Sequence, residues 1–161
     1  MCVRQTHITM EKKVKKAIIT LSKVFPATHS RKGDPTGFSG KLEKGEKRHT
    51  IRANYDWWAK KMEAINDGRM YLSIREWSGK PYCSPQNELR QIHKIGLQKV
   101  EMTYDSNDDV PQVWIDGKKI QIQDVCKNDG LELNDFVEWF FGHSKSNLLE
   151  GVCIQFTNFR Y

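Results

Sequence analysis

The stretch "GEKRHTIRANY", residues 45–55, combines a helix stop, a short strand and a dense group of basic side chains. Gly45 is typical of the residue that follows a helix, because glycine readily takes the left-handed conformation needed there. Alternate side chains of a strand share one face. A strand over residues 47–52 therefore places Arg48, Thr50 and Arg52 on one face, and that face is either solvated or the wall of a ligand cleft.

The length and composition indicate one globular domain. The chain has 161 residues, of which 38% are hydrophobic and 11% aromatic, enough for a core and unlike a disordered chain. No apolar run approaches the roughly 18 residues that a membrane-spanning helix needs. The basic start of the chain is not followed by an apolar segment, so we expect no secretory signal and no membrane partner.

The charge is unevenly distributed along the chain. The net charge is +6, but residues 1–60 hold 14 Lys/Arg against 5 Asp/Glu, so their net charge is +9 and that of residues 61–161 is −3. A basic excess of this kind indicates a polyanionic partner such as RNA. The alternative is a protein whose surface charge is merely uneven.

Cysteine and histidine spacing gives no metal motif. Four Cys are scattered without a C-x-x-C pair, and the five His also lack the spacing of zinc ligands. We therefore expect free thiols in a cytoplasmic protein that has no metal site and no cofactor. Residues 1–15 read as a flexible basic arm, and residues 16–161 as a single domain.

Hydrophobic periodicity and turn signals predict the elements that follow. Strands are expected over residues 17–22, 47–52, 70–77, 88–104 (one or two strands), 112–122 (a hairpin on Asp116-Gly117) and 151–159. Helices are expected over residues 35–44, 54–68 and within 128–143, the first one capped by Asp34 with Pro35 at its first position. Strands and helices do not alternate regularly. This pattern favours an α+β fold, a small, mixed, mainly antiparallel barrel with helices at its openings, over a doubly wound sheet.

Lys47 and Thr50 are candidates for a nucleophile and its base. A threonine hydroxyl attacks a carbonyl only when a base removes its proton. Lysine can be that base if burial or neighbouring cations lower its pKa from the usual value of about 10.4. Arg48 and Arg52 supply such cations. The competing interpretation is an ordinary strand edge, with solvated basic side chains and a threonine that favours β structure.

Two further residues of this group have two interpretations each. The Arg52 guanidinium offers a planar fork for a phosphate or an acyl oxygen, or it pairs with a surface carboxylate. Asp129 lies in "KNDGLEL", residues 127–133, before a predicted helix. It is either an N-terminal cap of that helix or the acid/base partner of the Lys/Thr pair.

The segment "EWSGKPYCS", residues 76–84, provides a second group of candidate ligand-binding residues. Trp77 and Tyr82 could stack on a base while Lys80 contacts a phosphate. Alternatively, Trp77 caps the core and Lys80 is only a loop charge. Trp57 and Trp58 belong to a helical aromatic stripe, which favours packing against the core.

The order of these motifs resembles the ASCH domain family of the PUA-like superfamily. The resemblance rests on "GEKRHTIR", then "LSIREWSGKPY", then "NDGLELNDFVEWF" and a final strand, and it covers residues 16–161. It implies a small β-barrel with helices at its openings. It also implies binding of RNA or of modified nucleosides.

The signature strand of many ASCH domains reads G-x-K-x-x-E-x-R, and here the Glu position is Thr50. Lys and Thr at these positions are similar to bacterial acetylcytidine amidohydrolases of the same family. By that resemblance Thr50 is the nucleophile, Lys47 its base, and Asp129 the later acid/base residue, one methylene shorter than the Glu of those enzymes. The sequence thus leaves two main hypotheses: an RNA- or nucleoside-binding module and a metal-independent amidohydrolase. In the binding module, phosphates would be held by Lys47, Arg48, Arg52 and Lys80. A third alternative is a structural or interaction protein that keeps only a relict cleft.

Overall fold

A computed structural model gives the fold of residues 13–161, and the predicted basic arm lies largely outside these described residues. The strands are β1 Lys15–Leu21, β2 His49–Arg52, β3 Met70–Trp77, β4 Gln86–Ile92, β5 Gly96–Thr103, β6 Gln112–Ile115, β7 Lys118–Ile120 and β8 Leu148–Gln155. The helices are α1 Phe38–Glu43, α2 Tyr55–Asn66, α3 Ile122–Asp129 and α4 Leu133–Phe141.

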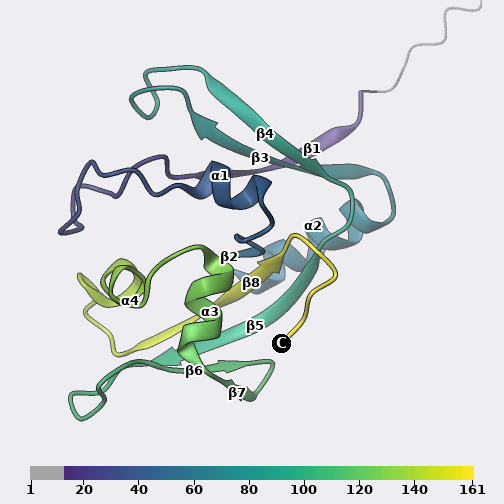
Figure 1. The fold of residues 1–161 in the computed structure, drawn as a ribbon. Helices are drawn as coiled ribbons and strands as arrows, with labels where there is room; N and C mark the ends of the chain where they lie inside the picture. Colours follow the sequence, from purple (N-terminus) through teal and green to yellow (C-terminus); the bar gives the residue numbers. More distant parts are fainter. Residues whose placement is uncertain (1–12) are drawn as a thin grey trace, which may run out of the picture.

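The strands form two sheets, one above the other in Figure 1. The smaller sheet has the order β1-β3-β4, and the larger has the order β2-β8-β5-β6-β7. β1 and β3 run parallel, and the other pairs are antiparallel. The predicted α+β class with mainly antiparallel strands is confirmed. The strands within residues 13–161 do not close into one barrel, so that finer expectation is not confirmed.

Helix α2 joins the two sheets by packing against β3, β5 and β8. Asn54 begins it, accepting a hydrogen bond from the backbone N–H of Trp57, and Trp58 and Ile65 enter the core. At the other end the Asn66 side chain makes two hydrogen bonds, of 2.9 and 3.0 Å, with the backbone of Ile95. The helix predicted over residues 54–68 is confirmed, but Trp57 lies on its exposed side.

The first helix begins later than predicted. Asp34 does not cap it, and Pro35 instead bridges to Val24 in an extended segment. The Thr36 hydroxyl holds this segment in place by donating to the carbonyl of Ser22 at 2.6 Å. Only after Gly37, in a left-handed conformation, does α1 begin at Phe38. A tertiary contact with the end of β1 thus overrides the local Asp-Pro signal.

The segment around residue 122 was also predicted incorrectly. The hairpin on Asp116-Gly117 is confirmed, with both turn residues at positive φ, but its second strand ends at Ile120. Residues 122–129 form α3, and its buried positions follow helical spacing: Ile122, Val125, Cys126 and Asp129. The turn expected at residue 128 is the end of this helix. The helix expected within residues 128–143 begins only at Leu133.

Gly151 lies where β2 pairs with β8, and it has no room for a side chain. A Cβ there would lie 2.7 Å from the carbonyl oxygen of Arg52. Gly151→Ala should therefore push β2 outward and lower the free energy of unfolding by about 1–3 kcal/mol. Gly40→Ala in α1 is the matched control, because nothing lies within 4 Å of its Cβ position.

The Gly40→Ala variant should raise the free energy of unfolding by about 0.5–1 kcal/mol, since alanine is the better helix residue. Urea unfolding of both variants measures the two changes. A Gly151→Ala protein as stable as the wild type would contradict the close approach of β2 and β8.

Candidate functional site

Lys47 and Asp129, far apart in the sequence, meet where β2 begins and α3 ends. The backbone N–H of Arg48 donates to the carbonyl of Asn128 at 2.7 Å, which holds the two segments side by side. The Lys47 ammonium donates to the Asp129 backbone carbonyl at 2.5 Å and lies 3.4 Å from Oδ1 of its carboxylate. Both residues are buried, at 2% and 4% exposed.

Asp129 is not an N-terminal cap. It is the last residue of α3, and Gly130 follows in a left-handed conformation with φ of 85°. A Cβ at position 130 would lie 3.4 Å from the Cβ of Lys47, so this turn also brings the backbone close to the lysine stem. The capping interpretation is therefore wrong, and the Asp-Gly pair instead places a carbonyl and a carboxylate against one amine.

Lys47, Thr50, Arg52 and Asp129 line one small cavity of about 230 Å³. The other lining residues come from the end of β1, from α1, β2 and α4, and from the turn after α3: Leu21, Ser22, Phe38, Ile51, Leu131, Trp139 and Phe140. Thr50 is itself only 3% exposed. The structure thus brings together four of the sequence-predicted site residues in a largely apolar enclosure.

Two cations share one carboxylate in this enclosure. The Arg52 guanidinium donates to the backbone carbonyls of Ile51 and Thr20, at 3.1 and 3.3 Å, rather than to an acid. Burial would raise the pKa of Asp129, but Lys47, His49 and Arg52 together outweigh this and hold it below the usual range. Asp129 is therefore ionised.

Burial lowers the pKa of Lys47, and the positive charge of Arg52 lowers it further, whereas Asp129 opposes the change. Burial also lowers the pKa of Arg52, but arginine remains protonated in proteins. Of these two cations, only lysine can lose its proton at an accessible pH. The lowered pKa moves Lys47 toward the neutral amine that a base requires.

Within the described residues, no hydrogen bond joins the Lys47 amine to the Thr50 hydroxyl. The amine is held by Asp129, and its charge lies 4.3 Å from the centre of the Phe38 ring. Catalytic hydrogen bonds are often long or absent before substrate binds. The amine and the hydroxyl line the same cavity, where a bound substrate would meet both.

Arg48 does not join this group. It precedes β2 and lies in a separate basic groove of about 640 Å³, which also contains Lys41, Lys44 and Lys127. Its guanidinium lies 5.2 Å from the Phe159 ring. The expectation that Arg48 shares a face with Thr50 and Arg52 is wrong, because the strand begins only at His49.

Trp77, Lys80 and Tyr82 line a larger groove of about 890 Å³. The rings of Trp77 and Tyr82 lie 5.1 Å apart at 50°, and Tyr82 is 90% exposed at a positive φ of 63°. The opposite wall is formed by residues 20–27 with Lys32 and Gly33. Leu21 and Ser22 line both this groove and the small cavity, so the two predicted groups of residues lie on neighbouring hollows.

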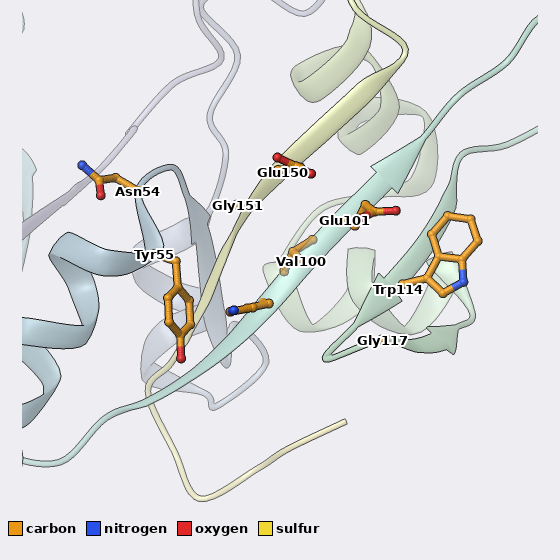
Figure 2. Close-up of a pocket in the computed structure, with 9 residues that line it drawn as sticks. Asn54, Tyr55, Val100, Glu101, Trp114, Gly117, Glu150 and Gly151 are labelled. Atoms are coloured by element: carbon orange, nitrogen blue, oxygen red, sulfur yellow. The ribbon is translucent and has the colours of Figure 1, made fainter.

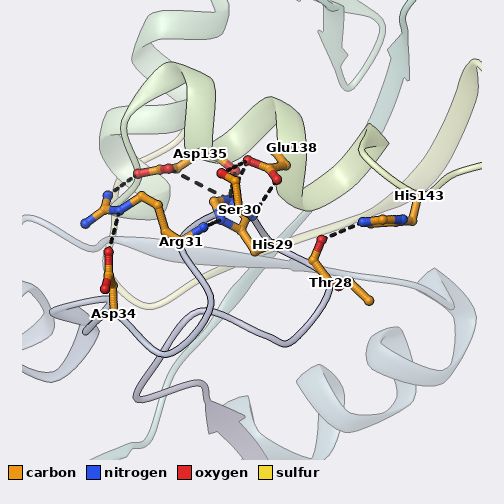
Figure 3. Close-up of polar contacts among 8 residues, drawn as sticks. All are labelled: Thr28, His29, Ser30, Arg31, Asp34, Asp135, Glu138 and His143. Carbon is orange, nitrogen blue, oxygen red and sulfur yellow. Dashed lines mark hydrogen bonds and ion pairs between the residues drawn. The ribbon is translucent and has the colours of Figure 1, made fainter.

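The loop that forms the opposite wall is fastened to α4, as Figure 3 shows. Ser30 donates to the Glu138 carboxylate through its backbone N–H and its hydroxyl, at 2.6 and 2.7 Å. Arg31 pairs with Asp135 at 2.6 Å. The buried His29 lies against the same two carboxylates. Because α4 also carries Trp139 and Phe140 of the cavity, this network holds the groove and the cavity in one arrangement.

A further depression lies on the outer face of the larger sheet, with Tyr55 and Trp114 on its two sides (Figure 2). Each of these two rings already faces a lysine of the same chain. Lys99 lies 5.0 Å from the Tyr55 ring, and Lys119 lies 5.9 Å from the Trp114 ring. None of the sequence-predicted site residues lines this depression.

Two residues near the site were not singled out from the sequence. His49 is fully buried, with its Nδ1 3.5 Å from Oδ1 of Asp129 and its Nε2 2.6 Å from the Tyr161 hydroxyl. Strand alternation places His49 toward the interior, but no local signal indicates its partners. Tyr161 lies 112 positions away in the sequence, so only the fold could reveal this contact.

Residues 13–161 contain no group of three or more His, Cys, Asp or Glu side chains placed to hold a metal ion. In the same part of the chain, no helix has the length and apolar character needed to span a membrane. Cys83, Cys126 and Cys153 are free thiols, and Cys2 lies outside the described residues. No protein-family model, curated protein or solved structure matches the chain in comparisons with known proteins.

The buried His49 should make stability depend on pH. Burial lowers the pKa of His49 in the folded state. Below the pKa of about 6.5 in the unfolded state, the unfolded state therefore binds more protons, and the free energy of unfolding decreases as the pH falls. Between about pH 7.5 and about pH 5.5 the wild type should lose about 1 kcal/mol more than His49→Gln. Chemical unfolding at both pH values measures the difference. Equal losses in the two proteins would show that His49 becomes protonated at about pH 5.5 in the folded state as it does in the unfolded state.

Proposed function

We propose that this chain is an ASCH-like, PUA-related domain that hydrolyses an acyl group from the exocyclic nitrogen of a cytidine-like nucleoside without a metal. The observation that carries the proposal is the burial of Lys47, Thr50 and Asp129 around one small cavity. A surface that only bound phosphates would leave its lysines open to solvent. The motif order and the mainly antiparallel α+β architecture support the family part of the proposal.

The proposed reaction uses Thr50 as the nucleophile. Neutral Lys47 accepts the hydroxyl proton while Thr50 Oγ1 adds to the acyl carbonyl. The Arg52 guanidinium stabilises the negative charge that develops on the carbonyl oxygen. The C–N bond then breaks and the protonated Lys47 returns the proton to the leaving nitrogen, with Asp129 holding the ammonium for this transfer.

A water molecule completes the cycle. Lys47, neutral again, removes a proton from water as the water attacks the acyl-Thr50 ester. The ester bond breaks, the threonine oxygen recovers the proton, and a carboxylic acid is released. The balance is one amide and one water converted into one amine and one acid, and each step uses groups that line the cavity.

The sizes of the two hollows agree with a ligand of this class. A cavity of about 230 Å³ is smaller than the roughly 300–1,000 Å³ of typical ligand pockets, whereas the neighbouring groove of about 890 Å³ lies within that range. The acylated edge of the base would enter the cavity beside Thr50. The sugar would remain in the groove, between Trp77 and the wall at Leu21 and Ser22.

Acetate release from acetylcytidine tests the reaction. Thr50→Val keeps the shape of the side chain but removes the nucleophile, so it should lower kcat by at least about a thousandfold. Lys47→Met should have a comparable effect. Arg48→Ala is the matched control, because Arg48 lies in a different groove and its loss should leave turnover unchanged. Normal turnover by the Thr50→Val protein would contradict the proposal.

A second candidate function is nucleotide or RNA binding without catalysis. Three lysines, Lys23, Lys32 and Lys80, line the same groove as the half-buried Trp77 and the exposed Tyr82. Aromatic rings beside cations are the common arrangement for stacking a base and holding its phosphate. In this alternative the buried cavity would recognise a modified base and leave it unchanged.

Trp77→Ala tests this groove through binding. Loss of one stacking ring should weaken the binding of a short single-stranded RNA by about 1–3 kcal/mol. Trp57→Ala is the control, since Trp57 is an exposed tryptophan on α2 that does not line the groove. Fluorescence titrations at two salt concentrations give both affinities and the phosphate contribution. Equal affinities for the two variants would exclude stacking on Trp77.

A further inference from the structure

We propose that Asn128, Tyr161 and His49 form a directional chain of hydrogen bonds that presents an N–H group to the Asp129 carboxylate and so positions Lys47. His49 and Tyr161 are then positioning residues for the reaction proposed above, and this inference rests on that proposed function. These hydrogen bonds reach the Lys47–Asp129 pair through His49. His49 belongs to β2, Asn128 to α3, and Tyr161 to the segment that follows β8.

The geometry connects four residues in sequence. The Asn128 side-chain amide donates to the Tyr161 hydroxyl oxygen at 3.1 Å. That hydroxyl lies 2.6 Å from Nε2 of His49, and Nδ1 of His49 lies 3.5 Å from Oδ1 of Asp129. The Tyr161 backbone N–H donates to the Gln98 side chain at 3.2 Å, so both ends of the tyrosine are held.

Counting donors indicates the direction of the chain. The Asn128 amide only donates, so the Tyr161 proton needs another acceptor, and Nε2 of His49 at 2.6 Å provides it. A neutral imidazole that accepts at Nε2 carries its proton on Nδ1. Burial keeps His49 neutral by lowering its pKa and keeps the Tyr161 hydroxyl protonated by raising its pKa. The Nδ1–H therefore faces the Asp129 carboxylate.

Nδ1 needs this role because it has no other partner. It is one of two buried side-chain nitrogen or oxygen atoms without a hydrogen bond in residues 13–161, and Oδ1 of Asp129 lies 3.5 Å from it. A buried donor without an acceptor is unfavourable, so the arrangement favours shortening of this contact. The shortened bond would fix the carboxylate beside the Lys47 amine.

The remaining ionisable groups around Asp129 do not compete for this role. Lys47 and Arg52 are the cations that it already faces. Burial raises the pKa of the Cys126 thiol to about 12 and that of Cys153 well above its usual value, so both thiols stay neutral. His49 is thus the neutral donor that can hold the carboxylate without adding charge. An amine displaced by about 1 Å would react far more slowly.

The test compares Tyr161→Phe, His49→Asn and His49→Gln. Tyr161→Phe removes the hydroxyl that fixes the histidine tautomer but keeps the ring and its backbone bond to Gln98. An asparagine amide at position 49 can place its N–H near the Nδ1 site, and a glutamine amide places it near Nε2. Phe159→Leu is the packing control, because the Phe159 and Tyr161 rings lie 5.0 Å apart.

Three readouts are needed. Nitrogen-15 NMR of His49 reports the tautomer, and carbon-13 NMR reports the titration of the Asp129 carboxyl. Acetate release gives kcat and KM separately. We expect the Nδ1–H tautomer in the wild type and in Phe159→Leu, and a mixture in Tyr161→Phe.

We also expect the Asp129 carboxyl to titrate about one pH unit higher in Tyr161→Phe and in His49→Gln. In the same two variants kcat should fall about tenfold or more with little change in KM, and His49→Asn should retain more activity than His49→Gln.

The outcomes separate this inference from the proposed function. An Nε2–H tautomer in the wild type, or an Asp129 titration unchanged in both Tyr161→Phe and His49→Gln, would overturn it even if the enzyme is active. The predicted tautomer and titration shifts in a protein that releases no acetate would support the hydrogen-bond chain and refute the amidohydrolase.

Discussion

The contact between the Lys47 amine and Asp129 is the interaction on which the site depends. A buried charge is costly unless it is paired, and here the buried Lys47 and the partly buried Arg52 face one carboxylate. Lysine can lose its proton, whereas arginine cannot. Burial therefore lowers the pKa of Lys47 in the same cavity that the Thr50 hydroxyl lines.

Two close backbone approaches make that burial possible. The Arg48–Asn128 backbone hydrogen bond attaches the start of β2 to the end of α3, and the left-handed Gly130 lets the chain turn directly against the lysine stem. On the other side, β2 pairs with β8, and at the end of this pairing Arg52 comes so close to Gly151 that only hydrogen fits there. The four-residue strand β2 is thus fixed on both sides, and its polar residues are buried together with the hydrophobic core.

The small cavity and the groove beside Trp77 and Tyr82 share lining residues and a supporting helix. Leu21 and Ser22 form a wall of both hollows, and α4 supports the cavity through Trp139 while holding the groove loop through Asp135 and Glu138. A ligand that filled the groove would press against residues that also shape the cavity. The same arrangement brings Lys47 and Asp129, which are 82 positions apart in the sequence, to one cavity.

Local sequence signals predict the α+β class, helix α2, strand β3 and the Asp116-Gly117 hairpin. The signals are an apolar stripe at helical spacing, a run of strand-forming residues and a pair of turn residues. The sequence also identified Lys47, Thr50, Arg52 and Asp129 as one group of candidates. The spacing of the first three and the later position of Asp129 resemble a known motif.

Other features depend on the tertiary structure, because local signals do not specify long-range contacts. Thr36 bound to Ser22 moved the start of α1. The burial of one face turned residues 122–129 into a helix. Long-range packing decides which side chains meet in a buried network. It places Arg48 in a different groove from Thr50 and Arg52, and it brings His49 into contact with Tyr161.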